Sequence, residues 1–119
     1  MTIKILIVED EPLSAEATEK LVSLWEKDSD IRSARTALQF EMIAKEWDPD
    51  IILLDIRIPG GDSLTILKSL RDEGNKSEII ITSAFDIFPY AKTAMELGVA
   101  SFLVKPVRTS QLFESLNKV

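Results

Sequence analysis

The sequence predicts an α/β fold: a doubly wound (βα)5 three-layer sandwich built on a five-stranded parallel sheet. Short runs of β-branched and other apolar residues alternate with amphipathic helical patterns along the chain. Each apolar run stops at polar residues, as expected where a buried parallel strand reaches its carboxyl end. Because strands that alternate with helices join through right-handed crossovers, the helices should cover both faces of the sheet.

Four apolar runs predict the clearest strands, at residues 3–8, 51–54, 79–82 and 100–104. The run at 100–104 is the weakest of the four. The segment 30–47 has the least regular pattern, and we interpret it as a short strand near residues 31–35 followed by a helix. No internal repeat or low-complexity tract interrupts this order.

Helical patterns fill the other intervals, at residues 14–26, 64–70, 89–97 and 109–118. In the first of them Ala17, Leu21 and Leu24 recur at helical spacing, and we expect these side chains to face the core. Gly98 follows the third pattern and is expected to end that helix, since glycine adopts the left-handed conformation found just past helix ends.

Length and composition indicate one globular domain and exclude several kinds of site. The chain has 119 residues, so we expect a single domain over 1–119. It has no cysteine and no histidine, which excludes disulfides, thiolate or imidazole metal sites and histidine-dependent catalysis. With a net charge of −6 and no basic run, direct binding of nucleic acid is not expected. Without a membrane span or signal-peptide pattern, the expected location is cytoplasmic.

Polar residues at four strand ends form the candidate functional site. They are Glu9 with Asp10, then Asp55, Ser83 and Lys105. Ligands of open α/β sheets bind outside the carboxyl ends of the strands, where these residues should converge. Taken singly each has an ordinary explanation, because acidic residues after a strand often cap a helix and most lysines are solvated.

The chemistry of the assembled set favours phosphoryl transfer. Three carboxylates in one place repel one another and need a cation, and Mg²⁺ prefers oxygen ligands of this kind. A shielded Asp55 carboxylate could then attack phosphorus and form an acyl phosphate. Lys105 would supply positive charge and Ser83 a hydroxyl donor to the phosphoryl oxygens.

Four motifs carry a family resemblance: EDEP at residues 9–12, DIRIPGGDSL at 55–64, TSA at 82–84 and LVKP at 103–106. Together they make the chain resemble the response-regulator receiver family of two-component signalling. The resemblance implies a flavodoxin-like fold in which Asp55 receives a phosphoryl group from a histidine kinase or a phosphotransfer protein. It also implies Mg²⁺ as the cofactor, with Mn²⁺ as a substitute.

The same resemblance assigns individual roles. It assigns the metal to Asp10, Asp55 and the backbone carbonyl of Arg57, with Glu9 acting through water. It makes Ser83 the hydroxyl that moves toward the phosphoryl group and Phe102 the aromatic residue whose rotamer reports that movement. It further implies a cis peptide bond between Lys105 and Pro106, which the chain can form because X-Pro bonds tolerate the cis form.

Two features of the loops bear on how this member of the family would behave. Ser63 stands where the family usually carries glycine, so the loop after Asp55 is expected to differ in shape while remaining competent. Arg57 and Phe85 each lie two residues beyond a site residue, and we predict that they tune the lifetime of the phosphoryl group.

The expected function is a signalling switch rather than a classical enzyme. One alternative is an interaction domain that works without phosphorylation, and a less favoured one is a small Mg²⁺-dependent phosphohydrolase. The stretch 83–107 resembles receivers attached to AraC-type or LytTR-type DNA-binding domains, so any contact with DNA would use an output domain absent from this chain or never present. Phosphorylation could also produce a homodimer. Ile87, Phe88 and Tyr90 are candidates for the switched surface.

Overall fold

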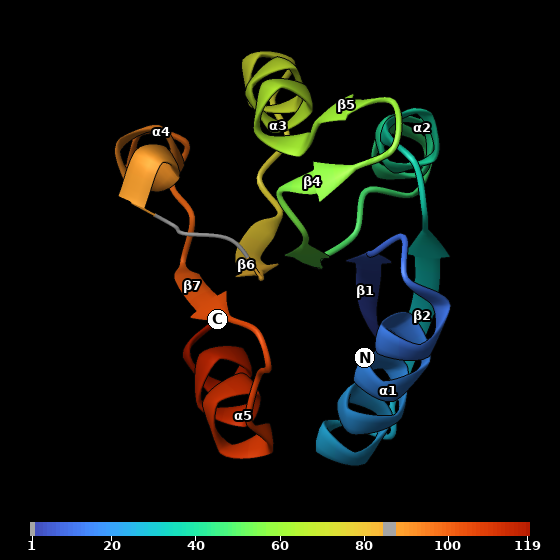
Figure 1. Cartoon of the computed structure of the whole chain (residues 1–119). Helices are drawn as coiled ribbons and strands as arrows, with labels where there is room; N and C mark the ends of the chain where they lie inside the picture. The colour runs from blue at the N-terminus through green and yellow to red at the C-terminus, as the bar shows by residue number, and fades with distance from the viewer. Residues whose placement is uncertain (1, 85–87) are drawn as a thin grey trace.

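The computed structural model describes residues 2–84 and 88–119 and contains the predicted parallel sheet (Figure 1). In this part of the chain, five strands are ordered β2-β1-β3-β6-β7. All pair in parallel. The strands are β1 (Ile3–Val8), β2 (Ser29–Ala34), β3 (Ile51–Leu54), β6 (Glu78–Ser83) and β7 (Ser101–Val104).

Helices cover both faces of the sheet, which confirms the three-layer sandwich. Figure 1 shows α1 and α5 on one side and α2, α3 and α4 on the other. The helices are α1 (Pro12–Trp25), α2 (Ala37–Trp47), α3 (Ser63–Asp72), α4 (Ala91–Glu96) and α5 (Thr109–Lys118), and a short 3₁₀ helix, η1 (Phe88–Tyr90), precedes α4. None of the described helices is long and apolar enough to cross a membrane.

Two apolar clusters hold the layers together because side chains of the central strands alternate between the faces. In β1, Leu6 packs with Phe40 of α2 in one cluster. The neighbouring Ile5 packs with Val22 of α1 and Leu112 of α5 in the other. In β1 and β3, the apolar residues of the runs 5–8 and 51–54 are all buried, as expected for a sheet covered on both faces.

The register brings the carboxyl ends of the central strands to one edge. Val8 lies opposite Leu54, and Leu54 lies opposite Ile81. Ser83, the last residue of β6, lies opposite Val104 of β7. The residues that follow these strands therefore start from neighbouring positions, and this is what positions the site.

The first helix differs from its predicted face. Leu24 is 71% exposed, and the buried residues of α1 are Ala15 and Val22. Ala17 is exposed as well, while Leu21 packs at the edge of a core cluster. The sequence offers two apolar stripes on this helix, and the packing against the sheet, which periodicity does not contain, selects between them.

A small antiparallel hairpin between β3 and α3 was not predicted. It pairs β4 (Arg57–Ile58) with β5 (Gly61–Asp62). Two-residue strands are too short to give a periodic signal, and the turn uses Gly60 at φ 96°, a conformation that favours glycine. The hairpin carries the chain from Asp55 to the first turn of α3.

Candidate functional site

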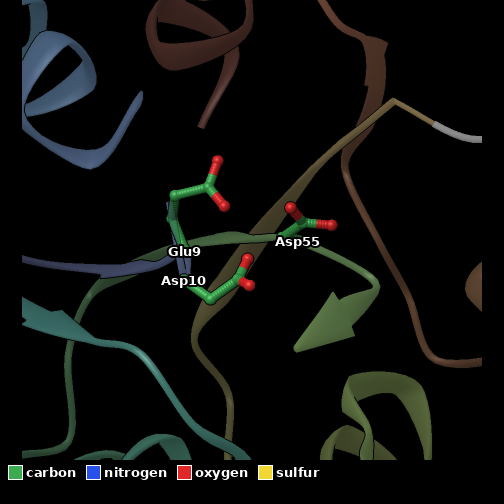
Figure 2. Close-up of side chains that lie close together, drawn as sticks. All are labelled: Glu9, Asp10 and Asp55. Atoms are coloured by element: carbon green, nitrogen blue, oxygen red, sulfur yellow. The ribbon is translucent and has the colours of Figure 1, made fainter. Parts of the chain in front are cut away.

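Three carboxyl groups gather at the carboxyl ends of β1 and β3. Glu9, Asp10 and Asp55 each offer one oxygen atom, and these oxygens lie within 4.8 Å of one another (Figure 2). Glu9 and Asp55 are buried, whereas Asp10 is exposed. The structure thus brings together the predicted acidic residues, and the burial of two of them strengthens their mutual repulsion.

Neither Glu9 nor Asp10 caps the following helix, although that was their ordinary explanation. The N-cap of α1 is Glu11, whose carboxylate accepts hydrogen bonds from the backbone N–H groups of Leu13 and Ser14. The Glu9 carboxylate itself accepts a long hydrogen bond of 3.4 Å from Glu11 N–H. Since the cap is supplied by another residue, the carboxylates of Glu9 and Asp10 remain available to the site.

Lys105 reaches into this acidic cluster from the loop after β7. Its Nζ donates to Asp55 Oδ2 at 2.9 Å and also to Glu9 Oε1. The peptide bond between Lys105 and Pro106 is cis, as the family resemblance implied. Lys105 N–H also donates to the carbonyl of Ser83 at 2.8 Å, which ties the ends of β6 and β7 together.

Burial and the neighbouring charges shift the pKa values of Asp55, Glu9 and Lys105, and not all in the same direction. Burial raises the pKa of Asp55 above its ordinary value, against the lowering influence of the hydrogen bond and charge of Lys105. Burial acts in the same sense on Glu9, but there Lys105 and other hydrogen-bond donors prevail and the pKa is lowered. The pKa of Lys105 is raised, because its two carboxylate partners outweigh the effect of burial. Lys105 is therefore a cation held between two carboxylates.

The donor set fits a hard divalent cation. Asp10, Asp55 and Glu9 supply only oxygen, and the whole chain contains no cysteine or histidine that would favour zinc. With Lys105 counted against the three carboxylates, the cluster keeps two formal negative charges. A Mg²⁺ ion would balance that charge.

Backbone and hydroxyl groups hold the loop that follows Asp55. Arg57 N–H donates to Asp55 Oδ1 at 3.3 Å. The hydroxyl of Ser63 lies 2.6 Å from the carbonyl oxygen of Asp55 and 2.7 Å from that of Ile56. In the sequence, Ser63 stands out only because the family usually has glycine there. Serine is common at the start of a helix, so nothing in the sequence indicated these contacts.

The predicted switch residues lie beside this loop. Ser83 is buried at the end of β6, and Phe102 of β7 is half-buried against the cluster that contains Phe40. The guanidinium of Arg57 donates to the hydroxyl of Tyr90 at 3.4 Å, a contact that the sequence did not indicate. Phe85, Ile87 and the side chain of Phe88 lie outside the described residues.

A family model described as the response regulator receiver domain matches residues 5–117. This chain belongs to that family. The receiver domain is a module of two-component signalling and not a classical enzyme, as the sequence predicted. Membership of this family argues against the alternative of a small phosphohydrolase.

Named relatives of this receiver domain are regulatory proteins about twice its length. It is 36% identical over 115 residues to the positive alginate biosynthesis regulatory protein of Pseudomonas aeruginosa, covering 96% of this chain and 46% of that protein. It is 32% identical over 124 residues to sensory transduction protein LytT of Oceanobacillus iheyensis, covering 100% and 48%. The chain thus spans about half the length of the curated relatives it matches.

A solved structure confirms the fold of the receiver domain. The N-terminal domain of an uncharacterized protein from Wolinella succinogenes superposes with a TM-score of 0.88 at 34% identity, covering 98% of this chain and 92% of that one. The flavodoxin-like prediction is therefore confirmed over nearly the whole chain.

Proposed function

We propose that Asp55 is the phosphoacceptor of this receiver domain and that a histidine kinase or phosphotransfer protein is the donor. The observation that carries the proposal is the setting of the Asp55 carboxylate, which is buried beside Lys105 and next to two further carboxylates. Burial removes water from this carboxylate, which raises the pKa of Asp55 and makes it a better nucleophile than an exposed carboxylate.

The reaction is an exchange of one bond to phosphorus for another. A carboxylate oxygen of Asp55 attacks phosphorus as the bond to the donor's histidine nitrogen breaks. The nitrogen leaves with the electron pair of the broken bond, and Asp55 becomes an acyl phosphate. Later attack of water on phosphorus returns the free carboxylate and inorganic phosphate.

The residues around Asp55 would bind the metal ion and the phosphoryl group. Asp10, Asp55 and the backbone carbonyl of Arg57 would hold Mg²⁺, with Glu9 acting through water, and Mn²⁺ would be a substitute. Such an ion supplies charge that lets an anionic nucleophile approach an anionic phosphoryl group. Lys105, already 2.9 Å from Asp55 Oδ2, is placed to bind a phosphoryl oxygen once one is attached.

The signal leaves the site through Ser83 and Phe102. The hydroxyl of Ser83 would move toward the phosphoryl group and donate to one of its oxygens. This movement of Ser83 would open space for Phe102 to turn inward, which would change the outer surface near α4. This role is supported by the burial of Ser83 and the half-buried position of Phe102. The alternative to such a phosphorylation-dependent switch is an interaction domain that works without phosphorylation.

The whole protein is proposed to be a transcription regulator. Residues 1–119 form the receiver domain, and DNA would be bound by an output domain of AraC-type or LytTR-type outside this chain. The likeness to LytT and, at 31% identity, to the transcriptional regulatory protein YesN of Bacillus subtilis supports a regulator without favouring either type. Homodimer formation on phosphorylation and a cytoplasmic location stay predictions.

Intact mass spectrometry after incubation with acetyl phosphate and Mg²⁺ tests the proposal. We expect one added phosphoryl group, which is lost in Asp55→Asn and retained in Asp30→Asn, a control on an exposed residue of β2. An adduct that persists in Asp55→Asn would place the acceptor elsewhere. No adduct with acetyl phosphate or a kinase would favour the interaction domain.

A further inference from the structure

Ser63 is a fully buried hydroxyl residue next to the phosphoacceptor loop. It is the first residue of α3 and is 0% exposed. Its Oγ lies 2.6 Å from the carbonyl oxygen of Asp55 and 2.7 Å from that of Ile56. Its backbone N–H also donates to the Ile56 carbonyl, at 3.1 Å. A hydroxyl has one hydrogen, so it is shared between the two carbonyls or alternates between them.

These contacts fix both peptide units that join Asp55 to Arg57. The Asp55 carbonyl belongs to the first unit and the Ile56 carbonyl to the second. The N–H of the second unit is that of Arg57, which donates to Asp55 Oδ1 at 3.3 Å. A continuous path thus runs from the Ser63 hydroxyl through one peptide group to the phosphoacceptor carboxylate, and each hydrogen bond in such a path polarises the next.

The hydroxyl does what a glycine at this position could not. The backbone N–H of residue 63 would still bind the Ile56 carbonyl in a glycine variant, because that contact needs no side chain. The hydroxyl contact to the Asp55 carbonyl would be lost with the side chain. The contact to the Asp55 carbonyl is therefore the one that the serine adds over a glycine.

We propose that Ser63 is a positioning residue for phosphoryl transfer. It holds the two peptide units after Asp55 so that the Arg57 N–H is directed at the carboxylate and the Arg57 carbonyl is set for the metal. The inference rests on the proposed function of Asp55 but concerns a residue that does not touch the phosphoryl group.

Two variants and a matched control test this role. Ser63→Ala and Ser63→Gly both remove the hydroxyl, and they differ in the volume left behind. Ser77→Ala is the control, because Ser77 is also buried and its hydroxyl also donates to a backbone carbonyl, that of Pro49 at 2.5 Å. Ser77 precedes β6, at the opposite end of the strand from Ser83. The control thus loses a similar hydrogen bond far from Asp55.

Three measurements are made on each variant: Mg²⁺ affinity by calorimetry, the rate of phosphorylation by acetyl phosphate at saturating Mg²⁺, and hydrogen exchange of the Arg57 amide by NMR. Both Ser63 variants should lose roughly three- to tenfold in Mg²⁺ affinity or phosphorylation rate, the range expected for one hydrogen bond. The Arg57 amide should exchange faster in both. The melting temperature of each variant is recorded as well. Ser77→Ala should melt at a lower temperature but keep the Mg²⁺ affinity, phosphorylation rate and Arg57 amide exchange of the unmodified chain.

The outcomes separate the two proposals. If both Ser63 variants lower only the melting temperature, as Ser77→Ala does, Ser63 is a structural residue and the inference is wrong. If the unmodified chain takes up no phosphoryl group, the proposed function fails, while Mg²⁺ affinity and Arg57 exchange still decide the role of Ser63.

Discussion

Lys105 acts as an internal counterion in this site. Its Nζ contacts Glu9 and Asp55, whose side chains are 7% and 8% exposed, while its own side chain is 23% exposed. Carboxylates buried to this extent repel each other strongly when no cation is near. The lysine that is proposed to bind the phosphoryl group thus also stabilises the site before phosphorylation.

Lys105→Met tests the role of Lys105 as a counterion before phosphorylation. The change keeps an unbranched apolar stem but leaves three carboxylates without their cation, so the Mg²⁺-free protein should lose about 1–3 kcal/mol of stability, discounted because the lysine is partly exposed. Mg²⁺ should bind more tightly than in the unmodified protein, since it no longer competes with the ammonium. Chemical denaturation with and without Mg²⁺, and calorimetry, measure both effects.

Lys118→Met is the control for that substitution. Lys118 pairs with Glu114 on the surface of α5 at 3.6 Å, and both side chains are well exposed. The control should change stability by less than about 0.5 kcal/mol and leave Mg²⁺ affinity unaltered. Weaker Mg²⁺ binding in Lys105→Met would contradict the counterion role.

For single residues, the sequence predicted which side chains lie together in the site but not which of them form ion pairs and hydrogen bonds. Glu9, Asp10, Asp55 and Lys105 each directly follow or lie near a strand end, so their convergence follows from the parallel sheet. The pairing of Lys105 with Glu9 depends on side-chain conformations in the folded state, which spacing does not contain. The hydroxyl contacts of Ser63 depend in the same way on the turn through β4 and β5.

At the scale of elements, one hydrogen bond joins the hairpin to the start of α4. Arg57 of β4 donates to the hydroxyl of Tyr90, the last residue of η1, over 3.4 Å. Arg57 lies two residues after Asp55, and Tyr90 packs against the same core cluster as Phe102. The contact therefore connects the phosphoacceptor loop with the region that is proposed to carry the signal outward.

Tyr90→Phe should lengthen the lifetime of the phosphoryl group. Loss of the hydroxyl allows the Arg57 guanidinium to spend more time over Asp55, where it would shield the acyl phosphate from water. Because a long, exposed hydrogen bond is weak, we expect dephosphorylation to slow by only about two- to threefold, with little change in stability. The decay of phosphorylated protein after removal of acetyl phosphate gives the rate.

A double-mutant cycle shows whether the effect passes through Arg57. In an Arg57→Ala background, Tyr90→Phe should no longer alter the dephosphorylation rate. If the two changes are additive, Tyr90 acts by another route and the connection between hairpin and helix carries no signal. Arg57→Ala alone also tests the predicted influence of Arg57 on lifetime.

Elements with long, uniform patterns were predicted well, and short or two-sided ones were not. The predicted final helix at 109–118 coincides with α5, which buries Leu112 and Leu116. The predicted end of the helix near Gly98 is confirmed by a φ of 73° at that residue. In α1, Ala17 and Leu24 of the predicted inner face are exposed and only Leu21 packs against the core, because packing decides the orientation of a helix on a sheet.

At the scale of the molecule, the order of the strands turns distant sequence positions into one site. β1 and β3 are adjacent, β6 follows β3, and β7 follows β6. Residues 9, 55, 83 and 105 therefore share one edge although almost the whole chain lies between the first and the last. A ligand that binds at this edge contacts loops from most of the fold, and its binding free energy stabilises the folded chain as a whole.

Mg²⁺ should accordingly raise the melting temperature of the entire domain. At 100 times the dissociation constant, linkage predicts about 2.7 kcal/mol of added stability and hence a rise of roughly 10 °C. Asp10→Asn should remove most of this rise, yet change the melting temperature in EDTA little because Asp10 is exposed. Asp30→Asn should respond to Mg²⁺ as the unmodified chain does. Calorimetric scans in EDTA and in Mg²⁺ measure the shift, and an equal shift in Asp10→Asn would mean that the ion binds elsewhere.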